Sequence, residues 1–223
     1  MAVYANGIDT KRSMVRVANK LLARKSAEEI KVREVASQCN CSAAAIYRHF
    51  DSLEYLLYVA SIGFLESYMD AFREVHESEK PTLERYLDGW ILFNKCAFRR
   101  PDIYHRLFWG KYNSQFYRAM GEYFELFPQK NDVPDQDFFF QMLFANGNLQ
   151  QRDLMILTIA SAKNIITAED AEFLSTTNPI LVETYLRRSI DASDEAREQS
   201  EAECNKLITQ NLARVYRDKS KKA

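Results

Sequence analysis

Residues 31–50, KVREVASQCNCSAAAIYRHF, hold two short amphipathic patterns separated by a polar turn. The first pattern has apolar side chains at i, i+3, i+4 and i+7, the spacing of one helical face. These side chains are Val32, Val35, Ala36 and Cys39. Asn40 tolerates the left-handed conformation that ends a helix, and Ser42 is a good N-cap for a second helix. Two helices joined by so short a turn form a helix-turn-helix.

The second helix of this motif begins at Ala43 and is short and rich in alanine. Ile46 and Phe50 lie four residues apart and are expected to pack the helix down. The side chains left largely outside are Tyr47, Arg48 and His49. Because the second helix of such motifs docks in the major groove, the segment predicts a surface that binds DNA.

The segment resembles the DNA-binding domain of the TetR family of bacterial transcriptional regulators. The resemblance covers roughly residues 11–60 and is closest over 46–57, IYRHFDSLEYLL. The apolar residues expected of the first helix are Met14, Val15, Ala18, Leu21 and Leu22. The resemblance implies an all-α fold. It also implies that residues 1–53 form a three-helix DNA-binding head. Residues 54–223 are then expected to form a larger helical bundle, here called the body, which binds a ligand and dimerises.

The same resemblance assigns roles to individual residues of the head. It implies that Arg33 reaches base edges, that Tyr47 contacts a phosphate, and that the start of the second helix faces the groove. Arginine suits guanine because it donates to O6 and N7 together, which is worth about 1–3 kcal/mol of discrimination. The expected DNA-binding residues are Lys31, Arg33, Ser42, Ala43, Ala44, Tyr47, Arg48 and His49.

Three features of the head depart from the family pattern. Asn40 stands where the family usually has glycine, and Leu53 stands where it favours a lysine near the phosphate backbone. Residues 43–45 are all alanine, so base reading there is limited to methyl contacts with thymine, and specificity leans on DNA shape. These departures leave open an alternative of another class: an interaction or adaptor protein with weak or lost specific DNA binding.

Charge is distributed unevenly along the chain. The whole sequence is almost neutral, with 30 Lys and Arg against 31 Asp and Glu, so it has no overall attraction for nucleic acid. Residues 1–57 hold nine basic and six acidic side chains, whereas residues 58–205 hold fifteen basic and twenty-four acidic ones. A basic head on an acidic body orients the molecule toward phosphate.

Composition and motifs exclude several classes of protein. Six glycines, five prolines and almost no alternating pattern favour an all-helical chain. No apolar run approaches the ~20 residues needed to span a bilayer, and no hydrophobic signal segment begins the chain, so we expect a cytoplasmic protein without a membrane partner. The sequence has no nucleophile elbow, phosphate-binding glycine loop or metal-spaced histidine cluster, and we expect neither an enzyme nor a cofactor.

The cysteines predict no metal site. Cys39 and Cys41 are spaced C-x-C, without a second pair downstream, which does not fit a zinc framework. We interpret both as small buried apolar side chains, with thiol sensing as the alternative.

The body is expected to consist of helices. Apolar spacing, Pro and Gly predict helices at 52–76, 81–98, 102–127, 136–145, 149–164, 168–190 and 193–216, with a loop at 127–135. The family resemblance implies that the last two helices form a homodimer surface. Their apolar residues are Phe173, Leu174, Ile180, Leu181, Leu186, Ile190, Leu207, Ile208, Leu212 and Val215.

Aromatic residues are dense between positions 90 and 144. Such rings can line an apolar pocket with polar tips or simply fill a helical core. The family resemblance implies an inducer pocket here, for a small apolar or aromatic effector. The candidates are Trp90, Phe93, Asn94, Tyr104, His105, Phe108, Trp109, Tyr112 and Phe144. The resemblance therefore implies a repressor that binds a palindromic double-stranded DNA operator as a homodimer and is released by an effector.

Overall fold

The computed structural model describes residues 2–128 and 147–219. Within these ranges the chain forms helices and no β-strand, which confirms the all-α prediction. The helices expected at 81–98, 149–164, 168–190 and 193–216 are present with ends shifted by a few residues. The helix expected at 136–145 and the candidate Phe144 lie outside the described residues.

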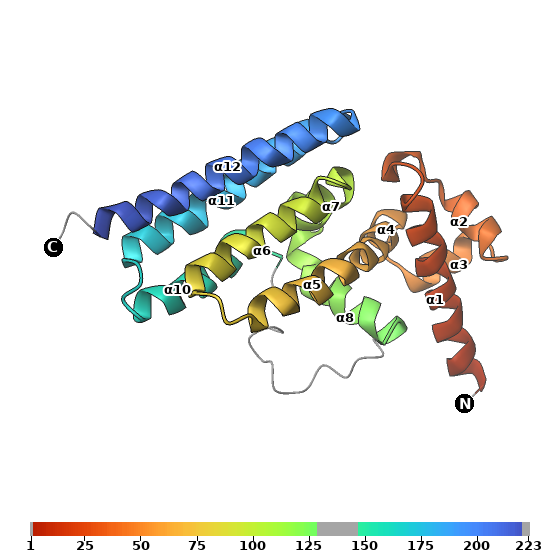
Figure 1. The fold of residues 1–223 in the computed structure, drawn as a ribbon. Helices are drawn as coiled ribbons and strands as arrows, with labels where there is room; N and C mark the ends of the chain where they lie inside the picture. The colour runs from red at the N-terminus through yellow and green to blue at the C-terminus, as the bar shows by residue number, and fades with distance from the viewer. Residues whose placement is uncertain (1, 129–146, 220–223) are drawn as a thin grey trace.

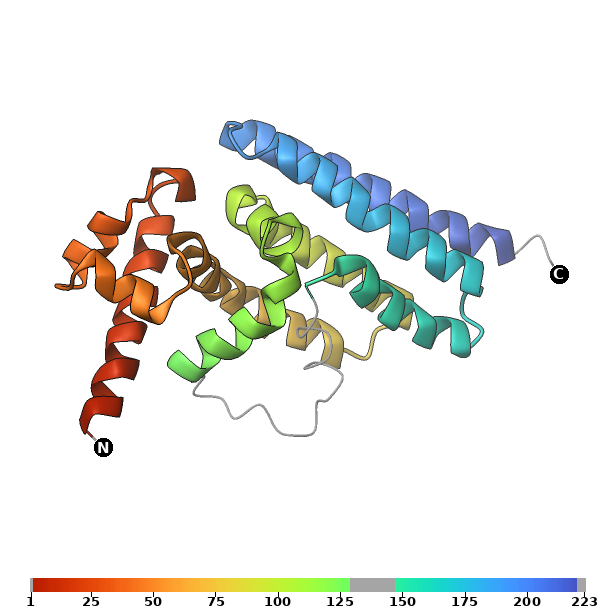
Figure 2. The same cartoon turned by 180° about the vertical axis from the view of Figure 1, so that it is seen from behind.

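The head lies at one end of the molecule (Figure 1). It contains α1 (Ala2–Leu22), α2 (Val32–Gln38) and α3 (Ala43–His49), with a 3-10 turn, η1, at Ala27–Glu29. The body helices are α4 (Leu53–Ser61), α5 (Glu66–Glu77), α6 (Thr82–Ala97), α7 (Pro101–Trp109), α8 (Phe116–Leu126), α10 (Leu149–Ala162), α11 (Ala168–Arg188) and α12 (Asp194–Lys219). Helices α11 and α12 run side by side along one edge, and Figure 2 shows α10 beneath α11.

Helix α4 joins the head to the body and is buried on all sides from Tyr55 to Ser61. It packs against α1 of the head and against α7 and α8 of the body. Tyr58 Oη donates to the carbonyl of Leu107 at 3.0 Å, and Tyr55 Oη donates to Glu122 at 2.9 Å. Both phenols lie within the apolar core, and both hydroxyl groups have hydrogen-bond partners. Burying these hydroxyl groups at the junction therefore costs little free energy.

The continuous helix predicted for 52–76 is interrupted by a 3-10 turn, η2 (Ile62–Leu65). A Cβ atom at Gly63 would lie 2.7 Å from Tyr123 Oη and 2.8 Å from Asn19 Nδ2. Asn19 Nδ2 also donates to the carbonyl of Ala60 at 2.9 Å. The break therefore sits where α1 and α8 approach the backbone too closely for a side chain. The helix predicted for 102–127 is also divided, because α7 ends at Trp109 and a turn with η3 (Asn113–Gln115) precedes α8.

Helices α11 and α12 bury much of their apolar surface against each other and against other helices of the same chain. Of the residues expected at a dimer surface, five are buried by neighbouring helices: Leu174, Leu186, Ile208, Leu212 and Val215. Phe173 and Ile180 on α11 remain 39% and 57% exposed. Among the described helices, none combines the length and apolar character needed to cross a bilayer.

Replacing Gly63 with alanine tests the close approach at η2. We expect Gly63→Ala to destabilise the protein by about 1–3 kcal/mol, because Tyr123 or Asn19 must move away from the added methyl group. Gly121→Ala in α8 is the matched control, since a Cβ there meets nothing within 4 Å and should stabilise the helix by about 0.5–1 kcal/mol. Urea unfolding of both variants measures the difference. Equal free energies of unfolding would contradict the account of η2.

Candidate DNA-binding surface and body cavity

The helix-turn-helix forms as the sequence predicts. Asn40 has a φ of 52°, the left-handed conformation expected between α2 and α3. Ser42 Oγ accepts a hydrogen bond from the backbone N–H of Ala45 at 3.2 Å and so caps α3. Ile46 and Phe50 are buried beneath α3. The turn is thus fixed by local interactions, and its geometry depends little on the body.

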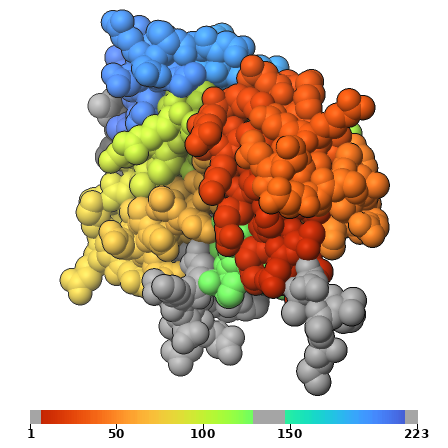
Figure 3. Space-filling model, turned by 90° about the vertical axis from the view of Figure 1, so that its right-hand side faces the viewer, coloured from red at the N-terminus to blue at the C-terminus, as the bar shows by residue number. Residues whose placement is uncertain are grey.

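The predicted DNA-binding residues belong to the head, which Figure 3 shows in red and orange on one side of the molecule. Six are exposed: Lys31, Arg33, Ser42, Ala44, Tyr47 and Arg48. Ala43 and His49 are half-buried. Tyr47 is 54% exposed although it is a large aromatic residue, which leaves its hydroxyl and ring free to contact a ligand. Burial, together with the nearby charges of Lys11 and Arg48, lowers the pKa of His49, so this ring is uncharged at neutral pH.

The two cysteines of the turn are half-buried and pack against the core. Burial raises the pKa of the Cys39 thiol, so this side chain stays protonated at neutral pH. A protonated thiol is a weak nucleophile, which favours the packing role over thiol sensing for Cys39.

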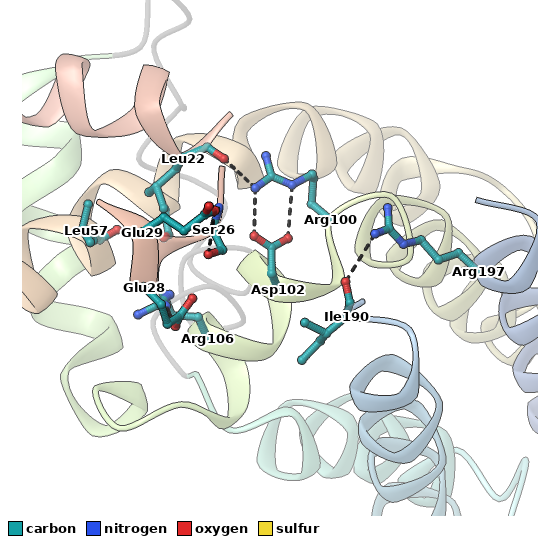
Figure 4. Close-up of polar contacts among 11 residues, drawn as sticks. Leu22, Ser26, Glu28, Glu29, Leu57, Arg100, Asp102, Arg106, Ile190 and Arg197 are labelled. Carbon is teal, nitrogen blue, oxygen red and sulfur yellow. Dashed lines mark hydrogen bonds and ion pairs between the residues drawn. The ribbon is translucent and has the colours of Figure 1, made fainter. Parts of the chain in front are cut away.

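Polar contacts link the head to α7 beside an open hollow of about 970 Å³. Arg100 Nη2 donates to the carbonyl of Leu22, at the end of α1, at 2.6 Å and pairs with Asp102 at 2.9 Å (Figure 4). Arg106 pairs with Glu28 of η1 at 2.7 Å. The Arg100 contact is partly buried, whereas the Glu28 side chain is 76% exposed. The two contacts should therefore differ in strength, although both join the head to the region of α7.

Two arginine variants test this difference in strength. Arg100→Met leaves the Leu22 carbonyl without its donor and should cost about 1–3 kcal/mol of stability. Arg106→Met breaks the exposed pair with Glu28 and should cost no more than about 1 kcal/mol. The comparison uses thermal and urea unfolding. A larger loss in Arg106→Met would show that the exposed pair is the stronger contact and would contradict this assignment.

The body contains an apolar cavity of about 260 Å³ between α5, α6 and α10. Its apolar wall includes Tyr68, Phe72, Val75, Trp90, Phe93 and Ile156. Its polar wall includes His76, Thr82, Arg85, Tyr86, Arg152 and Asp153. A concave apolar space with a few converging polar groups is the usual form of a small-molecule site.

Asp153 lies at the centre of a buried hydrogen-bond network. Its Oδ2 accepts from Tyr86 Oη at 2.8 Å and from Trp90 Nε1 at 3.0 Å. Asn178 Nδ2 donates to Tyr86 Oη at 2.9 Å, and Asn211 Nδ2 donates to Asn178 Oδ1 at 3.0 Å. Burial raises the pKa of Asp153 to about 8, against the opposing effect of its hydrogen bonds and of Arg152. The network therefore ties α10, α6, α11 and α12 together around a carboxyl group that is mostly uncharged at pH 7.

The aromatic candidates from the sequence fall in different places. Trp90 and Phe93 line the cavity, whereas His105 and Tyr112 line the hollow between head and α7. Asn94 Nδ2 donates to Asn205 Oδ1 at 2.7 Å and holds α6 against α12. The remaining described candidates lie in or against the core outside the cavity lining: Tyr104, Phe108 and Trp109.

Sequence reasoning missed the polar wall of the cavity. Tyr86 and Asp153 are 67 positions apart, so only the packing of α6 against α10 brings them together. The one local signal was the adjacent charged pair Arg152 and Asp153, which occupies buried positions of α10. Across residues 2–128 and 147–219, no group of three or more His, Cys, Asp or Glu side chains is placed to hold a metal ion.

The raised pKa of Asp153 predicts a pH-dependent stability. Between about pH 4 and about pH 8 the unfolded chain has this carboxyl ionised while the folded protein keeps it protonated, so stability falls as the pH rises. Asp153→Asn keeps an acceptor for Tyr86 and Trp90 and does not ionise. We expect its stability relative to the wild type to rise with pH across this window, with a slope of up to about 1.4 kcal/mol per pH unit.

Urea unfolding of the wild type and of Asp153→Asn at several pH values measures this difference. Asp191→Asn, which alters an exposed carboxyl beyond α11, controls for the loss of a charge. A constant free-energy difference between Asp153→Asn and the wild type would show that Asp153 is ionised in the folded protein.

The fold and the head define a helix-turn-helix protein with a larger helical body. Residues 15–57 match the family model described as bacterial regulatory proteins, tetR family. The match confirms the resemblance found in the sequence over these residues of the head.

Comparison with solved structures aligns this chain with two proteins at low sequence identity. One, from Rhodococcus sp., is described as a TetR-family transcriptional regulator. Its sequence is 18% identical to this one, and the TM-score is 0.48. The alignment covers 89% of this chain and 98% of the other chain. The second is RolR in complex with the ligand resorcinol, which is 15% identical, with a TM-score of 0.44 and coverage of 94% of both chains. Comparison with curated proteins finds no match.

Proposed function

We propose that this chain is a DNA-binding transcriptional repressor that acts in the cytoplasm as a homodimer and is released by a small-molecule effector. The observation that carries the proposal is the capped helix-turn-helix, whose exposed side chains lie within a segment that matches the TetR family. The proposed division of labour assigns DNA binding to residues 1–53 and effector binding and dimerisation to residues 54–223.

In this proposal α3 enters the major groove and α2 lies across its edge. Arg33 reads a guanine, and Tyr47 contacts a phosphate, with Lys31 and Arg48 adding positive charge to the backbone contact. Ser42, Ala43 and Ala44 face the groove at the start of α3, where the alanine methyl groups offer apolar contact to thymine. His49, at the end of α3, contributes a hydrogen bond through its ring nitrogens.

Dimerisation would pair α11 and α12 with the same helices of a second copy. Phe173 and Ile180 supply exposed apolar surface on α11 for this contact. A two-fold dimer places its two heads on half-sites separated by one helical turn of DNA or a multiple of it, which requires a palindromic operator.

The body cavity is the proposed effector site, and α5 is the element that connects it to the head. Tyr68, Phe72 and His76 of α5 line the cavity, and α5 follows directly from α4 through η2. Because α4 packs against α1, a ligand that favours a different position of α5 changes the orientation of the head. The effector then shifts the population toward dimers whose heads do not match the operator.

Selection of binding sites from a random pool of duplexes tests the repressor proposal. At near-physiological salt the wild type should enrich a palindrome, and Arg33→Ala should bind it about 10–100-fold more weakly because a bidentate contact to guanine is lost. Lys163→Ala, an exposed change at the end of α10, controls for the loss of one positive charge.

The same experiment can overturn the proposal. If no sequence is enriched and only weak, salt-sensitive retention remains, the phosphate term alone acts and specific recognition is absent. That outcome would favour the adaptor alternative, to which the alanines at 43–45 and Leu53 point.

A further inference from the structure

We propose that the cavity between α5, α6 and α10 takes a small aromatic anion, namely a one-ring carboxylic acid in its ionised form. This inference rests on the proposed function, because it names the ligand class of the effector site. Its evidence is nevertheless independent of DNA binding. It consists of the size of the cavity, the rings of its wall and the balance of charge among its lining residues.

The size of the cavity favours a single ring. A protein cavity of about 150 Å³ binds benzene, so a cavity of 260 Å³ has room for one ring and a short side chain, about ten non-hydrogen atoms in all. The wall contains rings set at steep angles to one another. Phe93 lies 5.6 Å from Tyr68 at 83° and 5.6 Å from Trp90 at 77°. Flat faces and edges of this kind contact a further aromatic ring favourably.

The charge on the wall favours an anion over a cation. Arg85 and Arg152 both line the cavity, and Asp153 is the only carboxyl group among the described lining residues. Because burial raises the pKa of Asp153 to about 8, its negative charge is mostly absent at pH 7. Arg85, whose one hydrogen bond in the described part of the chain goes to a backbone carbonyl, then presents its positive charge to the ligand. A cationic ligand would add a further positive charge beside Arg85 in the same apolar space.

Arg85 is the group that would hold the carboxylate. Its Nη1 donates to the carbonyl of His76 at 2.7 Å, which fixes the guanidinium at the end of α5. Its Nε is buried and has no hydrogen-bond partner in the described part of the chain. The Nε edge of a guanidinium offers two parallel donors that match the two oxygens of a carboxylate. A neutral ring would fill the apolar space and leave this buried donor unsatisfied.

Asp153 provides a second polar contact of the right kind. Tyr86 and Trp90 both donate to Oδ2 of this carboxyl group. Among the described residues, these are its two side-chain hydrogen bonds. The proton of the neutral form therefore belongs on Oδ1, where it can be donated to an acceptor on the ligand. An anionic ligand with acceptor oxygens satisfies both Arg85 and Asp153.

Calorimetric titration of the purified full-length protein, without DNA, tests the ligand class. The probes are benzoate and phenylacetate, with benzamide and phenylacetamide as neutral counterparts and benzylamine as the cation. At pH 7 each acid should bind at least about tenfold more tightly than its amide, since only the acid pairs with Arg85. Benzylamine should show no saturable binding.

A matched pair of variants on α6 assigns the effect to Arg85. Arg85→Met should weaken binding of both acids at least about tenfold and leave the amides unchanged, because methionine keeps much of the length without the charge. Lys95→Met, an exposed change on the same helix outside the cavity lining, should leave acids and amides unchanged. The comparison of acids, amides and amine on the wild type remains decisive even if Arg85→Met does not fold.

Three results would overturn the inference. They are equal binding of acids and amides, tighter binding of benzylamine than of the acids, and no saturable binding of either acid at about 10 mM. That concentration is about ten times the one that half-saturates a site with a Kd of 1 mM. The two proposals fail separately. Acids that bind to a protein without a selected operator would leave this inference intact and remove the repressor function. A selected operator with no acid binding would do the opposite.

Discussion

The burial of α4 is the constraint on which the rest of the structure depends. From Tyr55 to Ser61 every residue of this helix is buried, so head and body share one apolar core instead of two cores joined by a linker. Three hydrogen bonds anchor its surroundings: from Tyr55 to Glu122, from Tyr58 to Leu107 and from Asn19 to Ala60. The direction of α5, and with it one wall of the cavity, follows from where α4 ends.

This arrangement divides the contacts between head and body into strong and weak ones. Apolar burial around α4 contributes most of the free energy that holds the head, at about 25 cal/mol per Å² of apolar surface. The ion pairs of Glu28 with Arg106 and of Asp51 with Arg118 are open to solvent and contribute little. Exposed pairs of this kind can exchange partners at low cost.

Local signals made the head predictable from the sequence. The left-handed Asn40, the cap at Ser42 and the apolar spacing of α2 act within twenty residues, so their geometry follows from the chain itself. The break at Gly63 was not predictable, because it depends on Tyr123 and Asn19, which are distant in the sequence. Aromatic density located Trp90 and Phe93 at the cavity but does not separate a lining ring from a core ring, and Asp153 reaches the site only through helix packing.

The central claim is that the surface of α2 and α3 binds DNA. Hydrogen–deuterium exchange on the full chain, with and without a saturating duplex at low salt, tests it most directly, because phosphate contacts dominate binding under those conditions. The account predicts slower exchange over residues 31–50 and little change in α6, α10, α11 and α12. Unchanged exchange over residues 31–50, with protection confined to the body, would contradict it.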